Sequence, residues 1–99
     1  QEMIEASSDG LRVSGPMLIA GATELLASGR RFLSSAGKAN AVVFDLSAVE
    51  ETDSSALSVV FGWLRTAQAL GVAMRVANAP ASMISQAALY GVSDSLPLA

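Results

Sequence analysis

A carboxylate and two hydroxyls stand together where a run of apolar residues gives way to a long amphipathic stretch. They are Asp53, Ser54 and Ser55, in the segment ETDSSALS. A hydroxyl at a helix N-terminus, directly after a strand, lies where open α/β sheets tend to place their sites, and it could accept a phosphate or a partner's donor. The simpler interpretation is that Asp53 or Ser54 caps the helix by accepting hydrogen bonds from free backbone N–H groups. Spacing alone favours the cap.

Few other side chains suit catalysis. The chain contains no histidine and no cysteine, which excludes Ser-His and Cys-His nucleophile pairs and zinc sites of the usual ligands. It has no glycine-rich dinucleotide motif, and Gly37-Lys38 lacks the upstream glycine that a P-loop needs. We interpret Glu50, Glu51 and Asp53 as acids that complement a helix dipole, because Mg²⁺ requires several converging oxygen ligands. We therefore expect no enzymatic activity, no cofactor and no metal.

The composition is that of one small apolar domain spanning residues 1–99. Apolar residues make up 52% of the chain and charged residues 15%. This composition is apolar for a small soluble domain, so some of the apolar side chains could face a partner. The formal net charge is −3 and the basic residues are scattered, which argues against nucleic acid as a partner. No apolar run reaches the roughly eighteen residues of a membrane span, and no secretory signal is recognisable. We expect a cytoplasmic chain without direct membrane insertion.

The first half of the chain predicts two strands, a helix and a third strand. MIEAS and LRVSG alternate apolar and polar residues with period two, and Asp9-Gly10 between them is a hairpin turn signal. Residues Ala22–Ala36 have helical spacing, with Gly29 where the backbone could closely approach another element. AVVFDLS, residues 41–47, is nearly all apolar and predicts a central strand covered on both faces.

The second half predicts a helix, a strand and another helix. The spacing is helical over Ser54–Leu70, with Gly71 as a C-terminal stop, and VAMRVA over residues 72–77 alternates as a strand. Asn78 and Pro80 mark the start of a third helix that ends at Gly91, and its expected core face comprises Ile84, Ala87 and Ala88. The tail VSDSLPLA predicts a loop with a short strand or turn.

The resulting order is β-β-α-β-α-β-α. Strands joined through helices are expected to lie parallel, whereas the opening hairpin is antiparallel. The predicted fold is therefore α/β, with a mixed β-sheet of about four strands flanked by helices.

The helix over residues 54–70 presents two stripes at about 100° per residue. One stripe should pack on the sheet and comprises Leu57, Val60, Leu64 and Ala67. The other turns toward solvent and comprises Ser54, Ser58, Phe61 and Arg65. Phe61 is either a flank of the core or an aromatic anchor for a partner, with Arg65 supplying charge-assisted hydrogen bonds. Trp63, on the opposite flank, is expected to pack under the neighbouring helix.

Several segments together resemble one known family. They are FDLSAV, then D-S-S-x-L opening a helix, then GVAMRVAN, and then a helix ending in LYGV. This combination resembles the STAS family, named for sulfate transporters and anti-sigma-factor antagonists, over nearly the whole chain. Within the family, DSSAL, FGWLR and the terminal LYGV and LP look most like the MlaB-type subunit of the Mla lipid-asymmetry ABC transporter.

The resemblance implies a non-enzymatic accessory subunit that binds an MlaF-type ATPase. That ATPase belongs to an inner-membrane ABC transporter for phospholipid trafficking and outer-membrane lipid asymmetry, so the chain would be cytoplasmic and peripheral to the inner membrane through its complex. Combining the ATPase contact that the resemblance implies at Ser54 with the outward stripe of the helix, we expect the partner-binding residues to be Asp53, Ser54, Ser55, Ser58, Phe61 and Arg65.

The resemblance leaves a second function open, that of an anti-sigma-factor antagonist. In antagonists of this family, a partner anti-sigma factor kinase phosphorylates the hydroxyl that matches Ser54. Antagonists commonly have glycine where this chain has Ala56, whose Cβ is expected to narrow the approach of such a kinase. Phosphoserine would gain from the helix dipole but be repelled by Glu50, Glu51 and Asp53. We therefore expect Ser54 to act mainly as an unmodified contact.

Overall fold

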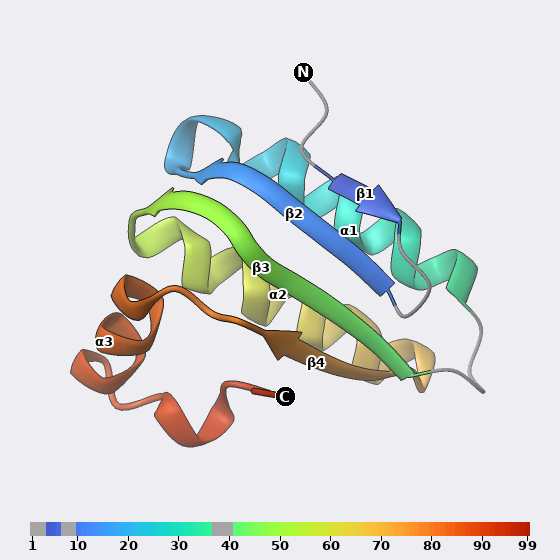
Figure 1. The fold of residues 1–99 in the computed structure, drawn as a ribbon. Coiled ribbons are helices and arrows are strands. Elements are labelled where there is room, and N and C mark those ends of the chain that lie inside the picture. Colours follow the sequence, from blue (N-terminus) through green and yellow to red (C-terminus); the bar gives the residue numbers. More distant parts are fainter. Residues whose placement is uncertain (1–3, 7–9, 37–40) are drawn as a thin grey trace.

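The computed structural model describes residues 4–6, 10–36 and 41–99. In these ranges the helices and strands follow the predicted order, with two additional short 3₁₀ helices (Figure 1). The elements are β1 (Ile4–Ala6), β2 (Gly10–Met17), η1 (Ile19–Gly21), α1 (Ala22–Ala36), β3 (Ala41–Thr52), α2 (Ser54–Leu70), β4 (Ala73–Ala77), α3 (Ala81–Leu89) and η2 (Ser93–Ser95).

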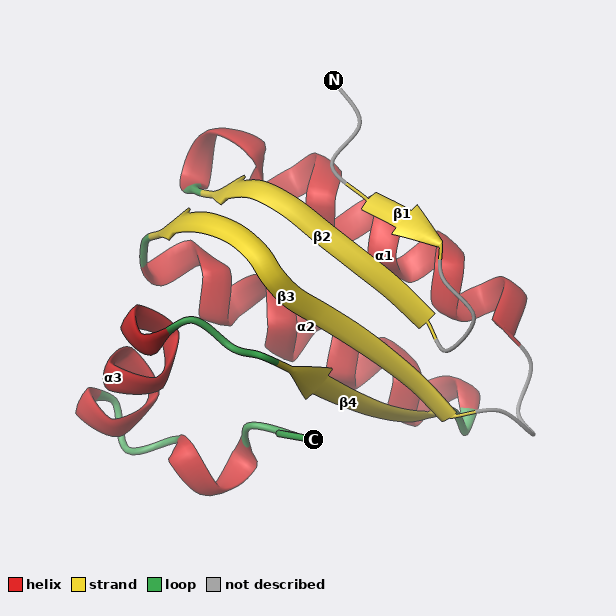
Figure 2. Ribbon diagram, viewed as in Figure 1, coloured by secondary structure: helices red, strands yellow, loops and turns green. Residues whose placement is uncertain are grey.

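The sheet has the strand order β1-β2-β3-β4 (Figure 2). β1 pairs antiparallel with β2, while β2, β3 and β4 run parallel. This confirms the α/β class and the mixed sheet. The antiparallel pairing expected from the opening hairpin is also present, although its turn residue Asp9 lies outside the described residues. β3 extends to Thr52, five residues beyond the predicted strand.

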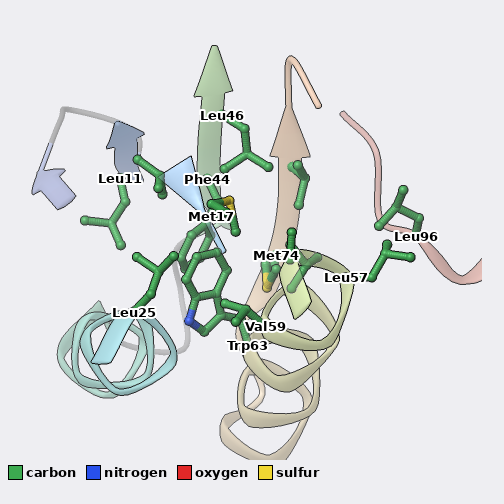
Figure 3. Close-up of a cluster of buried hydrophobic side chains, with 14 of the residues drawn as sticks. Leu11, Met17, Leu25, Phe44, Leu46, Leu57, Val59, Trp63, Met74 and Leu96 are labelled. Carbon is green, nitrogen blue, oxygen red and sulfur yellow. The ribbon is translucent and has the colours of Figure 1, made fainter. Parts of the chain in front are cut away.

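Helices α1 and α2 lie on the same face of the sheet (Figure 3). On β3, the side chains of Val42, Phe44 and Leu46 point into this covered face and are buried, whereas Val43 and Asp45 are only half-buried. The prediction that this strand is covered on both faces is therefore wrong. Its apolar sequence suggested burial on both sides, but Val43 interrupts the alternation without having a helix over it.

Trp63 is the centre of the core between the two helices and the sheet (Figure 3). Its ring is fully buried and stacks on Phe44, with centroids 4.4 Å apart. Its Nε1 donates a hydrogen bond to the carbonyl oxygen of Leu26 in α1, at 3.2 Å. A Cβ at Gly29 would lie only 2.0 Å from that nitrogen, so the expected close approach at this glycine and the position of Trp63 under α1 are confirmed.

The ends of α2 lie where the sequence indicated. Asp53 is the N-cap residue, and Gly71 ends the helix in the left-handed region with φ of 73°, a conformation that costs glycine little.

Helix α3 buries a narrower face than expected. Its buried residues are Met83 and Ala87, whereas Ile84 is 39% exposed and Ala88 is exposed. Ala87 was therefore placed correctly, and Ile84 and Ala88 were not. In a helix of nine residues with several alanines, apolar spacing fits more than one face, and Met83 takes the core position that Ile84 was expected to fill.

The C-terminal tail covers the outer edge of β4. The N–H of Val76 donates to the carbonyl oxygen of Pro97 at 2.7 Å, and the N–H of Ala99 donates to that of Val76 at 2.8 Å. Val76 and Leu98 form an isolated parallel bridge. The expected short terminal strand or turn is thus present, and it pairs an otherwise open sheet edge.

Among the described residues, no helix is long and apolar enough to cross a membrane.

Candidate functional site

The candidate site lies at the N-terminus of α2, where β2 and β3 both end (Figure 1). Asp53 follows β3 directly, and its N–H donates to the carbonyl oxygen of Met17, the last residue of β2, at 3.3 Å. The carboxyl ends of two parallel strands and a helix N-terminus therefore meet here, which is the usual place for a site in an open α/β sheet.

The Asp53 carboxylate bonds to two different segments. Its Oδ1 accepts the N–H of Ser55 at 2.9 Å and also the Ser55 hydroxyl, while Oδ2 accepts the N–H of Ile19 at 2.9 Å. These hydrogen bonds, from the Ser55 side chain first and the Ile19 backbone next, lower the pKa of Asp53 below its ordinary value. Asp53 is thus both the cap of α2 and the anchor of the segment that leads into η1.

The two serines have different environments. Ser55 is only 9% exposed and its hydroxyl is bonded to Asp53. Ser54 is exposed, and its side chain makes no hydrogen bond to the described residues. Ser54 is therefore the hydroxyl that a partner can reach, while Ser55 serves the cap.

A groove of about 810 Å³ opens beside Ser54. Apolar side chains from four segments line it: Ile19, Leu26, Phe61, Tyr90 and Val92. Ser54, Ser58 and Arg65 contribute its polar groups. Ile19 is 73% exposed and Tyr90 is 59% exposed, so large apolar side chains of this groove face solvent. We refer to this surface as the α2 groove.

The predicted outward stripe of α2 lines this groove. Ser54, Ser58 and Arg65 are exposed, and Arg65 has no ion pair or hydrogen bond to the part of the chain that the structure describes. Phe61 is half-buried, because it packs against the core and also lines the groove. Phe61 is therefore a flank of the core, as one alternative had it, and its role as an anchor for a partner stays a prediction.

The inward stripe is wider than predicted. Leu57, Val60 and Ala67 are buried as expected, and Leu64 is half-buried against the core. Val59 and Trp63 widen the buried face.

Sequence reasoning missed the groove residues that come from other segments, namely Ile19, Ala22, Thr23, Leu26, Tyr90 and Val92. Their only signal in the sequence was an apolar surplus, which indicates a contact surface without locating it.

Ala56 does not take part in the exposed surface. It is 1% exposed and belongs to the core. The expectation that its Cβ narrows the approach of a partner is therefore wrong. At the start of α2, the side chain of Ala56 turns inward, as that of Ser55 does. The acids near Ser54 remain as a physical reason against phosphorylation.

The acidic residues near the site form no ligand cluster. Among residues 4–6, 10–36 and 41–99, no group of three or more His, Cys, Asp or Glu side chains could hold a metal ion. Glu50 and Glu51 are exposed at the end of β3, and both Asp53 oxygens already accept hydrogen bonds.

The site as a whole offers a hydroxyl, a guanidinium and an apolar groove, which suit recognition of a protein surface.

Comparison with solved structures shows the class of fold. A protein from Thermotoga maritima assigned as an anti-sigma factor antagonist matches with a TM-score of 0.74 and 17% identity, covering 96% of this chain and 82% of the other. The anti-sigma factor antagonist SpoIIAA in its unphosphorylated form matches with a TM-score of 0.63 and 16% identity, covering 84% and 77%. The fold is thus that of a STAS domain.

The sequence defines the family. A family model described as "Mlab, STAS domain" matches residues 1–98, so the chain belongs to this family of STAS domains. No curated protein matches the sequence.

Proposed function

We propose that this chain is a non-enzymatic accessory subunit that binds the cytoplasmic ATPase of an inner-membrane ABC transporter. The transporter would move phospholipids and maintain the lipid asymmetry of the outer membrane. Membership of the family described as MlaB STAS domains supports this assignment. The residues in contact with the ATPase would be Ser54, Ser58, Phe61 and Arg65. Asp53 and Ser55 would stabilise the conformation of this contact surface.

The observation that carries the proposal is the exposed Ser54 beside the α2 groove. The Ser54 hydroxyl and the Arg65 guanidinium, which have no partner among the described residues, border exposed apolar side chains on the same surface. Aromatic and arginine side chains are over-represented among the residues that dominate protein interfaces. The chain contains no histidine and no cysteine, which suits a subunit that regulates a partner.

Affinity purification from membranes of the native organism tests the proposal. We expect the tagged chain to retain an ABC ATPase together with its permease and to lose it when Arg65 is replaced by alanine. Recovery of an anti-sigma factor kinase, with no ATPase, would instead support the second candidate function.

That second function is an anti-sigma-factor antagonist switched by phosphorylation of Ser54. The structural likeness to two such proteins and the exposure of Ser54 at a helix N-terminus favour it. The neighbouring acids oppose it, because a phosphate adds a charge of about −1.5 to −2 beside them. Intact-mass spectrometry of protein from the native organism distinguishes the two: we expect the unmodified mass, whereas a substantial phosphorylated fraction at Ser54 would favour the antagonist.

A further inference from the structure

Four exposed acidic residues lie close in the chain to residues that line the α2 groove. Glu50 and Glu51 are exposed and lie four and three residues before Ser54. Glu24, in the first turn of α1, and Asp94, in η2, are also exposed. Glu24 and Asp94 each lie within two residues of a residue that lines the groove. We call these four residues, Glu24, Glu50, Glu51 and Asp94, the acidic border.

The described basic side chains lie elsewhere, with one exception. Arg12 and Arg75 are exposed and alternate with buried neighbours in β2 and β4, so they point away from the helices. Arg30 and Arg31 lie in the second half of α1 and do not line the groove, although Arg30 Nε donates a hydrogen bond to Thr66 Oγ1 at 3.1 Å, next to Arg65 in α2. Only Arg65, among the residues that the structure describes, brings a positive charge to the groove. Among the described residues, the groove is thus apolar with the guanidinium of Arg65 in its lining and Arg30 beside it, and the four exposed acids near it outnumber these two cations.

From this charge pattern we propose the chemistry of the surface that docks here. It is an apolar patch of the ATPase subunit bordered by lysine or arginine side chains, with one carboxylate opposite Arg65. The inference rests on the proposed function and specifies the partner surface that it requires. Complementary charges across an interface increase the rate of encounter and fix the orientation of the partners.

The same pattern disfavours the other occupants of an apolar groove. A second copy of this chain would bring an identical acidic border, and the net charge of each copy is −3, so like charges would face one another. An anionic lipid surface would also be repelled, because basic rather than acidic segments are attracted to it. A basic-bordered protein surface is the occupant that both the apolar residues and the charges fit.

The test measures how the chain binds the purified ATPase subunit of the transporter from the same organism. Surface plasmon resonance gives the association rate at about 50 mM and about 500 mM NaCl, since salt screens exposed charges. The double variant Glu50→Gln/Glu51→Gln removes two charges from the acidic border. A matched control, Ser34→Lys/Gln68→Lys, raises the net charge by the same two units at exposed positions outside the groove.

We expect the border variant to associate about fivefold more slowly than wild type at low salt, with the difference shrinking at high salt. The control should change by less than about twofold, because its charges lie away from the contact. The second pair Glu24→Gln/Asp94→Asn should act in the same direction as the border variant.

Two outcomes would contradict this account, and they are distinguishable. If wild type binds the ATPase but both border pairs associate at the wild-type rate, or the control slows equally, the acidic border plays no part and only this inference fails. If wild type does not bind the ATPase at all, the proposed function fails and this inference fails with it.

Discussion

The carboxylate of Asp53 accepts the backbone N–H of Ile19, a residue 34 positions earlier in the chain, at 2.9 Å. The same side chain caps α2 through Ser55. One acid therefore fixes the position of a groove-lining residue relative to the helix that presents Ser54. A change at Asp53 should affect folding and partner binding together, which separates it from the exposed contact residues.

The first prediction concerns the pH dependence of stability. The folded-state pKa of Asp53 lies below its ordinary value because of its hydrogen bonds to Ser55 and Ile19. Its contribution to stability is therefore present above the ordinary pKa and is lost as the pH falls through the folded-state pKa. Asp53→Asn keeps a capping oxygen but no charge, so its urea midpoint should fall less than that of wild type between pH 7 and about pH 3.

Asp45 contributes to acid sensitivity with the same sign, because hydrogen bonds from the Asn78 side chain and the Ser47 backbone lower its pKa. Both proteins should thus lose some stability in acid. Identical losses in wild type and Asp53→Asn would show that the carboxylate charge at position 53 does not stabilise the fold.

The second prediction concerns the packing of α1 on Trp63. Gly29→Ala would place a Cβ within 2.0 Å of Trp63 Nε1, and the buried ring has no room to move. We expect a loss of about 2–3 kcal/mol in the free energy of unfolding, despite the better helix propensity of alanine. Gly21→Ala is the control, since nothing lies within 4 Å of its added Cβ. Denaturation in urea measures both, and equal stability of the two variants would contradict the packing described.

The bounds of α1 and α2 could be predicted from the sequence because each helix has its own signals. The apolar spacing of residues 22–36, the capping Asp53 and the terminal Gly71 are local features. The uncovered face of β3 could not be predicted, because Val43 looks the same in sequence whether or not a helix covers it. The predicted burial of Ile84 was wrong for a similar reason, since apolar spacing in a short alanine-rich helix does not select one face.

The candidate site was predictable only in its α2 part. Helical geometry correctly grouped Ser54, Ser58 and Arg65 on the outward face. Ile19 and Tyr90 come from distant segments and join the groove through the fold. No local pattern indicates that they meet, and the bond from Ile19 to Asp53 depends on the tertiary structure.

The third prediction separates binding from folding. Ser54→Glu adds a charge beside the acidic border, and Arg65→Ala removes the groove's guanidinium. Each variant should bind the ATPase at least about tenfold more weakly, a loss of about 1.4 kcal/mol. Both residues are exposed, so the free energy of unfolding should stay within about 0.5 kcal/mol of wild type. Gln68→Ala should leave both quantities unchanged, and normal ATPase binding by both variants would place the interface elsewhere.

The fourth prediction concerns the intermediate position of Phe61. Because its ring is half-buried, Phe61→Ala should cost about 1–2 kcal/mol of folding stability and also weaken ATPase binding. Phe44→Ala is the reference for full burial and should cost about 3–5 kcal/mol. Calorimetry of the isolated chain and binding titrations measure the two effects. A loss for Phe61→Ala as large as that for Phe44→Ala would assign Phe61 to the core alone.

The central claim is that the α2 groove contacts the transporter ATPase, and site-specific cross-linking tests it most directly. The chain has no cysteine, so Ser58→Cys and the control Gln68→Cys each introduce one attachment point for a benzophenone photo-cross-linker. Both residues are exposed on α2, but only Ser58 lines the groove. We predict that illumination of the complex joins the ATPase to the probe at position 58 and not at position 68. Cross-linking from position 68 alone, in a complex that forms normally, would contradict the claim.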